Sequence, residues 1–379
     1  MKRVPVIDLV RFASIFVVIG WHFFPRWVAT FAHSEWLSQL ILKCFLNGAY
    51  GVTCFFVVSG FLITQMLVGH ETNFSKIDLK SFYVKRAARI FPLLAAVILV
   101  GFTLAHLKWL MMERAANYNS WNVDDGFGWA FWISLLTFNF NWLLIAKGFV
   151  GFGMHWAVLW SLAVEEQFYL CYPLVVKRLK NEKRVLVFLI SVVVFAIAFR
   201  VWVFFFMGAN THWMHEASFA SFDQIALGGL LYFLQKKVAE RLKENTWMAV
   251  LVMISGMAVC GYLYVETSFD DGNQAIFVPT LMAAGCALTI LGGLYMPGLN
   301  TSLVRAFSWP GKLSYGCYLW HPTIIFLLIP VLTALGGLWG LAYLLVSVWF
   351  FAFISYKCFE IPLNNRIRAF FGLKPSQSL

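Results

Sequence analysis

The chain alternates between long apolar segments and short polar loops along nearly its whole length. Uncharged runs such as 91–107 and 185–199 approach the roughly 20 apolar residues that an α-helix needs to cross a bilayer. We therefore predict an all-α fold, a polytopic bundle of about ten membrane-spanning helices. The predicted spans are 6–24, 49–69, 90–110, 157–176, 185–207, 219–235, 247–265, 275–295, 313–334 and 338–358.

The composition and the placement of charge support this reading. Of the 379 residues, 61% are hydrophobic and only 12% are charged, whereas a soluble domain carries about a quarter charged residues. The net charge of +11 comes from Lys and Arg clusters between apolar segments, which argues against a nucleic-acid partner. By the positive-inside rule these clusters place both termini in the cytoplasm. We expect a transmembrane domain at 1–365 and a short cytoplasmic tail at 366–379.

The apolar segment 127–146 does not fit a simple alternation of crossings. It is apolar enough to span, as is 157–176, yet the loop that follows them carries the basic residues Lys177 to Arg184. Two crossings from an outer loop would leave that basic cluster outside, against the positive-inside rule. We therefore predict that 127–146 lies in the outer interface or re-enters the membrane, and that only 157–176 crosses.

The seven cysteines lie mostly inside apolar segments. Their odd number and the lack of a C-x-x-C spacing argue against a complete disulfide framework. We interpret them as small buried apolar residues, and we expect no metal site.

Ionisable residues in the first predicted helix are functional candidates, because such groups are costly inside a membrane. Arg11 and His22 share one helical face to within about 20° and are about 16 Å apart along the axis. Asp8 lies one turn before Arg11 and is expected to pair with it. Histidine is the natural general base for a hydroxyl nucleophile. The alternative is structural: an ion pair at the inner interface and a histidine that caps a buried carbonyl.

A second polar stripe follows the predicted helix at 157–176. Ser161, Glu165 and Tyr169 are spaced four residues apart on an otherwise apolar helix. Facing Arg11 or His22 would satisfy the Glu165 carboxylate. A structural hydrogen-bond network between helices is the alternative.

Other polar residues are candidates on the donor side. Arg86 and Arg89 lie one turn apart at the predicted inner mouth of 90–110, and guanidinium groups suit phosphate oxygens. Plain anchoring by positive charge is the alternative. His321 is expected in the inner half of its helix, where it either contacts substrate or caps Ser314 or Tyr315.

Two charged residues are candidates on the acceptor side. Arg200 and Asp223 lie in consecutive predicted helices. They either bind the acceptor or pair with each other.

Six stretches in order along the chain resemble acyltransferase family 3, the bacterial inner-membrane O-acyltransferases that modify cell-surface glycans. They are the Asp8…Arg11-x10-His22 helix, GVTCFFVVSGFLIT (51–64), FYVKRAARIFPL (82–93), LWSLAVEEQFYLCYPL (159–174), FDQIALGGLL (222–231) and LSYGCYLWHP (313–322). Together they cover nearly the whole chain. Thr53 and Cys54 stand where the family pattern usually reads GVDLFF, so any role of an acid at that point is absent here.

The resemblance implies roles for individual residues. His22 would be the catalytic histidine, with Arg11 essential on the same helix, and Glu165 or Glu166 would match the family's acid. Arg86 and Arg89 would match its R-x-x-R and contact acyl-coenzyme A, a co-substrate rather than a tightly bound cofactor. Ser314 and His321 are taken as further donor-side residues.

The resemblance also implies the setting. Some family members carry an extra periplasmic hydrolase-like domain, whereas this chain ends soon after its tenth predicted helix. We therefore expect transfer without such a domain or with a separate periplasmic partner.

These observations lead to a hypothesis for function. We expect an O-acyltransferase that moves an acyl group, acetyl by default, from cytoplasmic acyl-coenzyme A to a hydroxyl of an extracytoplasmic glycan or lipid-linked sugar. His22 would remove the hydroxyl proton, with Glu165 holding the imidazole tautomer, and an acyl-histidine intermediate stays open. The rival reading is a transporter or channel that uses the same residues as a substrate or proton path.

Overall fold

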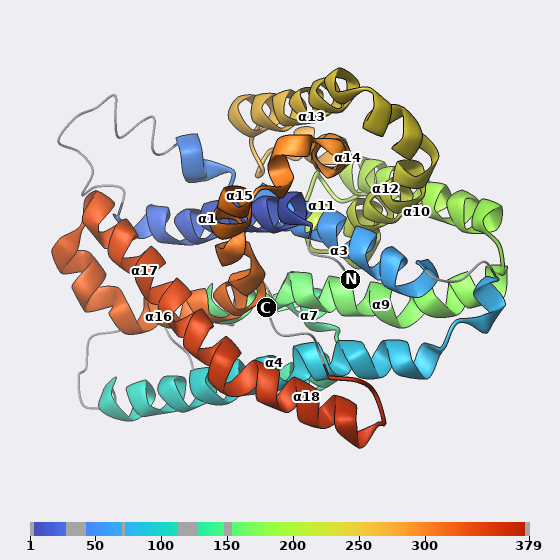
Figure 1. Ribbon diagram of the computed structural model, residues 1–379. Coiled ribbons are helices and arrows are strands. Elements are labelled where there is room, and N and C mark those ends of the chain that lie inside the picture. Colours follow the sequence, from blue (N-terminus) through green and yellow to red (C-terminus); the bar gives the residue numbers. More distant parts are fainter. Residues whose placement is uncertain (1–3, 28–42, 70–72, 113–127, 148–153, 376–379) are drawn as a thin grey trace. The chain divides into compact units, whose positions relative to one another are not determined.

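All regular structure in the described residues is helical, as predicted (Figure 1). The computed structural model describes residues 4–27, 43–69, 73–112, 128–147 and 154–375. Ten long helices in this part of the chain correspond one to one to the predicted spans. They are α1 (Pro5–Trp27), α3 (Tyr50–Val68), α4 (Leu79–Met112), α9 (Leu159–Leu179), α10 (Glu182–Phe206), α12 (Ser218–Glu244), α13 (Thr246–Glu266), α14 (Val278–Tyr295), α16 (Ser314–Leu335) and α17 (Gly337–Ser355).

Length and hydropathy identify these helices as membrane spans. Within the described residues, nine helical segments are long and apolar enough to cross a bilayer. Helix α9 is not among them; it is less apolar than these segments and carries two acidic and two basic residues. Its 21 residues still extend about 31 Å, the thickness of a hydrocarbon core. The prediction of a polytopic helical membrane protein is confirmed.

The segment 127–146 does not form one spanning helix. It folds as α6 (Trp129–Leu136) and α7 (Phe140–Lys147), each eight residues long and therefore about 12 Å. The break falls at Phe138, whose φ of 56° lies in the left-handed region that interrupts a right-handed helix. Neither helix alone can cross a bilayer. The position of this segment in the outer interface stays a prediction.

Contacts divide the chain into two compact units. Unit 1 comprises Met1–Ile77 and Val164–Ser314, and unit 2 comprises Asp78–Ala163 and Tyr315–Leu379. Unit 1 contains α1, α3, most of α9, α10, α12, α13 and α14. Unit 2 contains α4, α6, α7, nearly all of α16, α17 and α18 (Ile361–Phe370).

Unit 1 is held together by close helix packing at small residues. Helices α3 and α12 cross where Gly60 faces the Ile225 carbonyl and Gly228 faces the Val57 carbonyl. Helices α13 and α14, adjacent in Figure 1, meet at Gly256 in the same way. Small residues let the backbones of membrane helices approach closely, so van der Waals packing holds them together where the hydrophobic effect does not.

This packing makes a prediction about stability. Gly228→Ala would push a methyl group into the backbone of α3, and such overpacking costs about 1–3 kcal/mol. Gly261→Ala, on α13, is the matched control because a methyl group there meets nothing within 4 Å. Thermal unfolding in detergent should show a lower midpoint for the first variant and an unchanged or higher one for the second. Equal midpoints would contradict the packing described here.

Unit 1 has two ends that differ in charge. We call the end that holds the C-terminus of α1 the His22 end, and the opposite end the Asp8 end. At the His22 end Asn47, before α3, donates to the Tyr264 and Thr267 carbonyls (2.8 and 2.6 Å) and accepts from the Phe269 amide at 3.0 Å. The described charges there are mainly acidic: Glu216, Glu266, Asp270 and Asp271.

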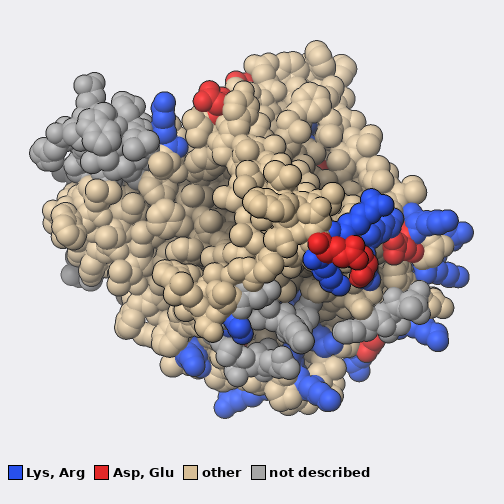
Figure 2. Space-filling view, turned by 45° about the horizontal axis from the view of Figure 1, so that its top comes forward, with Lys and Arg blue, Asp and Glu red and all other residues tan. Residues whose placement is uncertain are grey.

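The Asp8 end of unit 1 carries the basic clusters. Lys177, at the end of α9, donates to the Ile77 carbonyl at 2.9 Å, and Lys237 of α12 lies 3.8 Å from Glu182 of α10. Figure 2 shows Lys and Arg in clusters beside a broad uncharged surface. The positive-inside rule assigns the basic end to the cytoplasm; the orientation of the termini stays a prediction.

Unit 2 is built around an aromatic core and ends in a helix that the sequence reading did not anticipate. Phe131 of α6 contacts Phe140 and Trp156 edge to face, at centroid distances of 5.8 and 5.5 Å. Helix α17 continues through a π-helical turn, Tyr356–Glu360, directly into α18. The boundary placed at 365/366 between domain and tail falls inside α18, because the helix continues past it to Phe370.

Candidate active site

His22 lies near the end of α1, and its ring is hydrogen-bonded to the backbone of the same helix. Its Nδ1 lies 2.9 Å from the carbonyl oxygen of Val18, one turn earlier. A carbonyl can only accept a hydrogen bond, so Nδ1 is the donor in this contact, and Nε2 is the ring nitrogen that could take part in proton transfer. The half-buried ring also contacts Trp21 edge to face, at 4.7 Å between centroids.

Glu165 was predicted to hold the tautomer of His22, but the group that contacts Nδ1 of this ring is a backbone carbonyl. In a serine-protease triad a carboxylate binds this nitrogen, whereas here the Val18 carbonyl does so. Glu165 itself is half-buried on α9. Two residues further on, Gln167 accepts from the Ser218 hydroxyl at 2.5 Å, which places this part of α9 at the His22 end of unit 1. A catalytic contact of Glu165 therefore stays a prediction.

Arg11 and Asp8 lie toward the opposite end of the same helix. Arg11 is half-buried and Asp8 is 8% exposed. Asp8 is close to η6 (Trp309–Leu313), where its carbonyl faces Gly311. The pairing of Asp8 with Arg11, and the functional role of Arg11, stay predictions.

Arg200 and Asp223 form a buried ion pair, the structural one of their two predicted alternatives. Arg200 Nη2 lies 2.8 Å from Asp223 Oδ2, and both side chains are fully buried. Arg200 also donates to the Ile276 carbonyl at 2.9 Å and to the Ala220 carbonyl. Thr280 of α14, which the sequence reading missed, donates to Asp223 Oδ2 at 2.5 Å. The network ties α10, α12 and α14 together, and the side chains of Arg200 and Asp223 have no exposed surface with which to contact a glycan.

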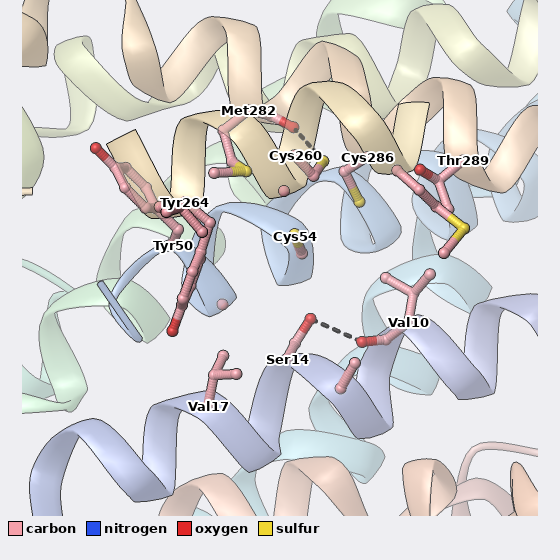
Figure 3. Close-up of a pocket in the computed structure, with 15 residues that line it drawn as sticks. Val10, Ser14, Val17, Tyr50, Cys54, Cys260, Tyr264, Met282, Cys286 and Thr289 are labelled. Carbon is pink, nitrogen blue, oxygen red and sulfur yellow. Dashed lines mark hydrogen bonds between the residues drawn. The ribbon is translucent and has the colours of Figure 1, made fainter. Parts of the chain in front are cut away.

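An apolar cavity of about 360 Å³ lies between α1, α3, α13 and α14 (Figure 3). Val10, Ser14 and Val17 line it from α1, and the Ser14 hydroxyl is turned back to the Val10 carbonyl at 2.7 Å. The middle of this face is about 110–130° around α1 from Arg11 and His22. The cavity and the His22 face are therefore separate features.

The cysteines are only partly as predicted. Cys286 and Cys317 are buried, and Cys54 and Cys260, which line the cavity in Figure 3, are half-buried. The prediction was wrong for three cysteines, which are exposed on helix faces turned away from the protein core: Cys44, Cys171 and Cys358.

In unit 2, Arg86 and Arg89 lie within the first third of α4, because this helix begins earlier than predicted, at Leu79. Arg86 is half-buried and Arg89 is exposed. Arg89 is close enough to Glu360, in the π-helical turn, for the two charges to attract each other. Of the two arginines, Arg89 is therefore the more accessible to solvent.

His321 and Ser314 are fully buried at the start of α16. His321 Nδ1 donates to the Cys317 carbonyl at 3.1 Å, so its backbone partner is Cys317 rather than Ser314 or Tyr315. The Ser314 hydroxyl has no hydrogen-bond partner among the described residues. Their predicted contact with the donor stays a prediction.

Residues 4–356 match the acyltransferase domain family known as acyltransferase family 3. The chain belongs to this acyltransferase family. The predicted family and the predicted class of enzyme are both confirmed. No solved structure matches the chain.

Curated relatives of this family-3 chain are O-acetyltransferases. It is 25% identical to the O-acetyltransferase OatA of Staphylococcus aureus, over 99% of this chain and 60% of that protein. It is 26% identical to the peptidoglycan O-acetyltransferase OatA of Listeria monocytogenes, over 98% of this chain and 58% of that protein. The putative peptidoglycan O-acetyltransferase YrhL of Bacillus subtilis is 24% identical, over 96% and 55%. The chain thus spans 60% or less of the length of these relatives.

Proposed function

We propose that this family-3 acyltransferase moves an acetyl group from cytoplasmic acetyl-coenzyme A to a glycan hydroxyl beyond the inner membrane. The names of the relatives favour acetyl as the group and peptidoglycan as the acceptor. The ten helices and the basic Asp8 end of unit 1 support a membrane enzyme whose donor side is cytoplasmic.

The hydrogen bond between His22 Nδ1 and the Val18 carbonyl is the observation that carries this proposal. With its proton on Nδ1, bonded to the Val18 carbonyl, the ring offers Nε2 as a base. Nε2 would take the hydroxyl proton while the oxygen attacks the thioester carbonyl. The new ester bond forms, the carbon–sulfur bond breaks, and the proton then passes to the departing thiolate of coenzyme A.

The donor side of the proposal rests on unit 2. Arg86 and Arg89 offer guanidinium groups one turn apart on α4, which suits the phosphate groups of coenzyme A. The acidic His22 end of unit 1, where Glu165 also lies, would face the acceptor. A separate periplasmic protein that passes the acetyl group onward is compatible with this scheme.

Purified protein in liposomes, given radiolabelled acetyl-coenzyme A and peptidoglycan fragments, tests the proposal. Label should appear in ester linkage on the fragments and should be released by mild base. Uptake of acetyl-coenzyme A or sugar without any labelled ester would instead support the transporter reading and overturn the proposal.

A further inference from the structure

The end of the chain carries a polar stripe that directly follows the π-helical turn. Glu360 ends the turn, and Asn364 and Arg368 follow it at intervals of four residues. Asn364 and Arg368 therefore share one face of α18. The Arg368 Nε and Asn364 Oδ1 atoms are buried and have no hydrogen-bond partner within the described residues. Arg366, on the opposite face of the same helix, is exposed.

This stripe faces the helix that carries Arg86 and Arg89. Helix α18 packs against α4, and the two lie side by side in Figure 1. The covered face of α18 is the one that bears Asn364 and Arg368, since Arg366 is exposed. At the start of the stripe, Glu360 is near enough to Arg89 for the two charges to attract each other.

The π-helical turn before α18 also favours a functional role for this part of the chain. A π-helical turn is rare and is frequently found at functional sites, and here it comprises Tyr356–Glu360. It adds a residue to the helical turn and so sets which face of α18 meets α4. Buried polar atoms without partners are also uncommon in folded proteins, and here two of them lie on one face of one helix.

We propose that Arg368 and Asn364 of α18 complete the phosphate-binding site that Arg86 and Arg89 begin on α4. The inference rests on the proposed function, and it names residues that the family's R-x-x-R does not include. Three guanidinium groups outnumber the one carboxyl group of Glu360, so the net charge is at least about +2, which complements a polyanionic donor. Arg368 supplies a planar fork for phosphate oxygens, and its unpartnered Nε is a donor. The unpartnered atom of Asn364 is an acceptor, so this side chain would contribute through its NH₂ group.

The test is the affinity of the full-length protein, in nanodiscs, for acetyl-coenzyme A. Arg368→Ala should raise Kd about tenfold or more, because a hydrogen bond between charged groups is lost. Arg366→Ala is the matched control: it removes the same charge from the opposite face of the same helix and should change Kd less than about twofold. Arg368→Lys should recover only part of the loss, because lysine lacks the fork.

A donor without phosphates separates this role from a structural one. S-acetylpantetheine lacks the phosphate groups, so Arg368→Ala should leave its rate of use unchanged. Equal Kd values for the two alanine variants, or an equal loss with S-acetylpantetheine, would overturn the inference and leave the proposed function intact. A wild-type protein that binds no acetyl-coenzyme A would overturn the proposed function, and this inference with it.

Discussion

Replacing His22 with alanine should lower the rate of acyl transfer by about 10²- to 10⁴-fold, the usual contribution of a positioned general base. The reason is that Nδ1 is bonded to the Val18 carbonyl, so Nε2 is the ring nitrogen that would take the proton in the proposed step. The decrease should appear in kcat, because the proton moves during the chemical step and not on binding. Initial rates of ester formation at saturating acetyl-coenzyme A measure it.

His212→Ala is the matched control for this variant. His212 also belongs to unit 1 and pairs with an acid, Glu216, at 3.1 Å, but it is 47% exposed and lies on a different helix. Its loss should leave kcat within about a factor of two. A His22→Ala enzyme with normal kcat and a normal amount in the membrane would refute the catalytic assignment.

Replacing Arg200 with methionine should produce the largest loss of stability among single substitutions in unit 1. It leaves Asp223 buried and charged without its cation, and breaking a buried pair in this way costs about 3–5 kcal/mol. The free energy of unfolding in detergent, from titration with a denaturant, measures the loss. Removing both charges, as Arg200→Met with Asp223→Leu, should restore much of it, because no buried charge then lacks a partner.

An exposed pair on the same two helices is the control. Glu182 of α10 and Lys237 of α12 lie 3.8 Å apart, with side chains 42% and 60% exposed. Lys237→Met should therefore cost less than about 1 kcal/mol. A comparable loss at both pairs would show that the burial of Arg200 and Asp223 does not determine stability.

The spans were predictable because a membrane helix must satisfy every backbone hydrogen bond within itself and present apolar side chains to lipid. That requirement leaves long apolar runs, which the ten observed helices follow. The break at Phe138 was not predictable in the same way, since an apolar run of twenty residues fits one helix as well as two. Helix α18 was not predicted because it is short and polar, so its sequence does not indicate a membrane span.

The residues of the candidate site also differ in how far the sequence predicts them. His22, Arg86 and Arg89 could be singled out because ionisable residues in or beside apolar helices are rare and their spacing is visible. The Val18 carbonyl that binds His22 Nδ1 could not be singled out in this way, because every residue has a backbone carbonyl. Arg200 and Asp223 were left with two alternatives, because their spacing in the sequence does not show that they meet in a buried ion pair or that Thr280 of a third helix joins them. The spacing of Glu360, Asn364 and Arg368 is visible in the sequence, but only the packing of α18 against α4 relates these residues to the arginine pair.

The most direct test of the account is transfer across a sealed vesicle. Proteoliposomes sorted for one orientation would receive acetyl-coenzyme A on the side of the Asp8 end and glycan fragments on the other side, neither of which crosses the lipid. The account predicts ester-linked acetyl on the fragments, absent from His22→Ala vesicles. Transfer only when donor and acceptor share one side would contradict it.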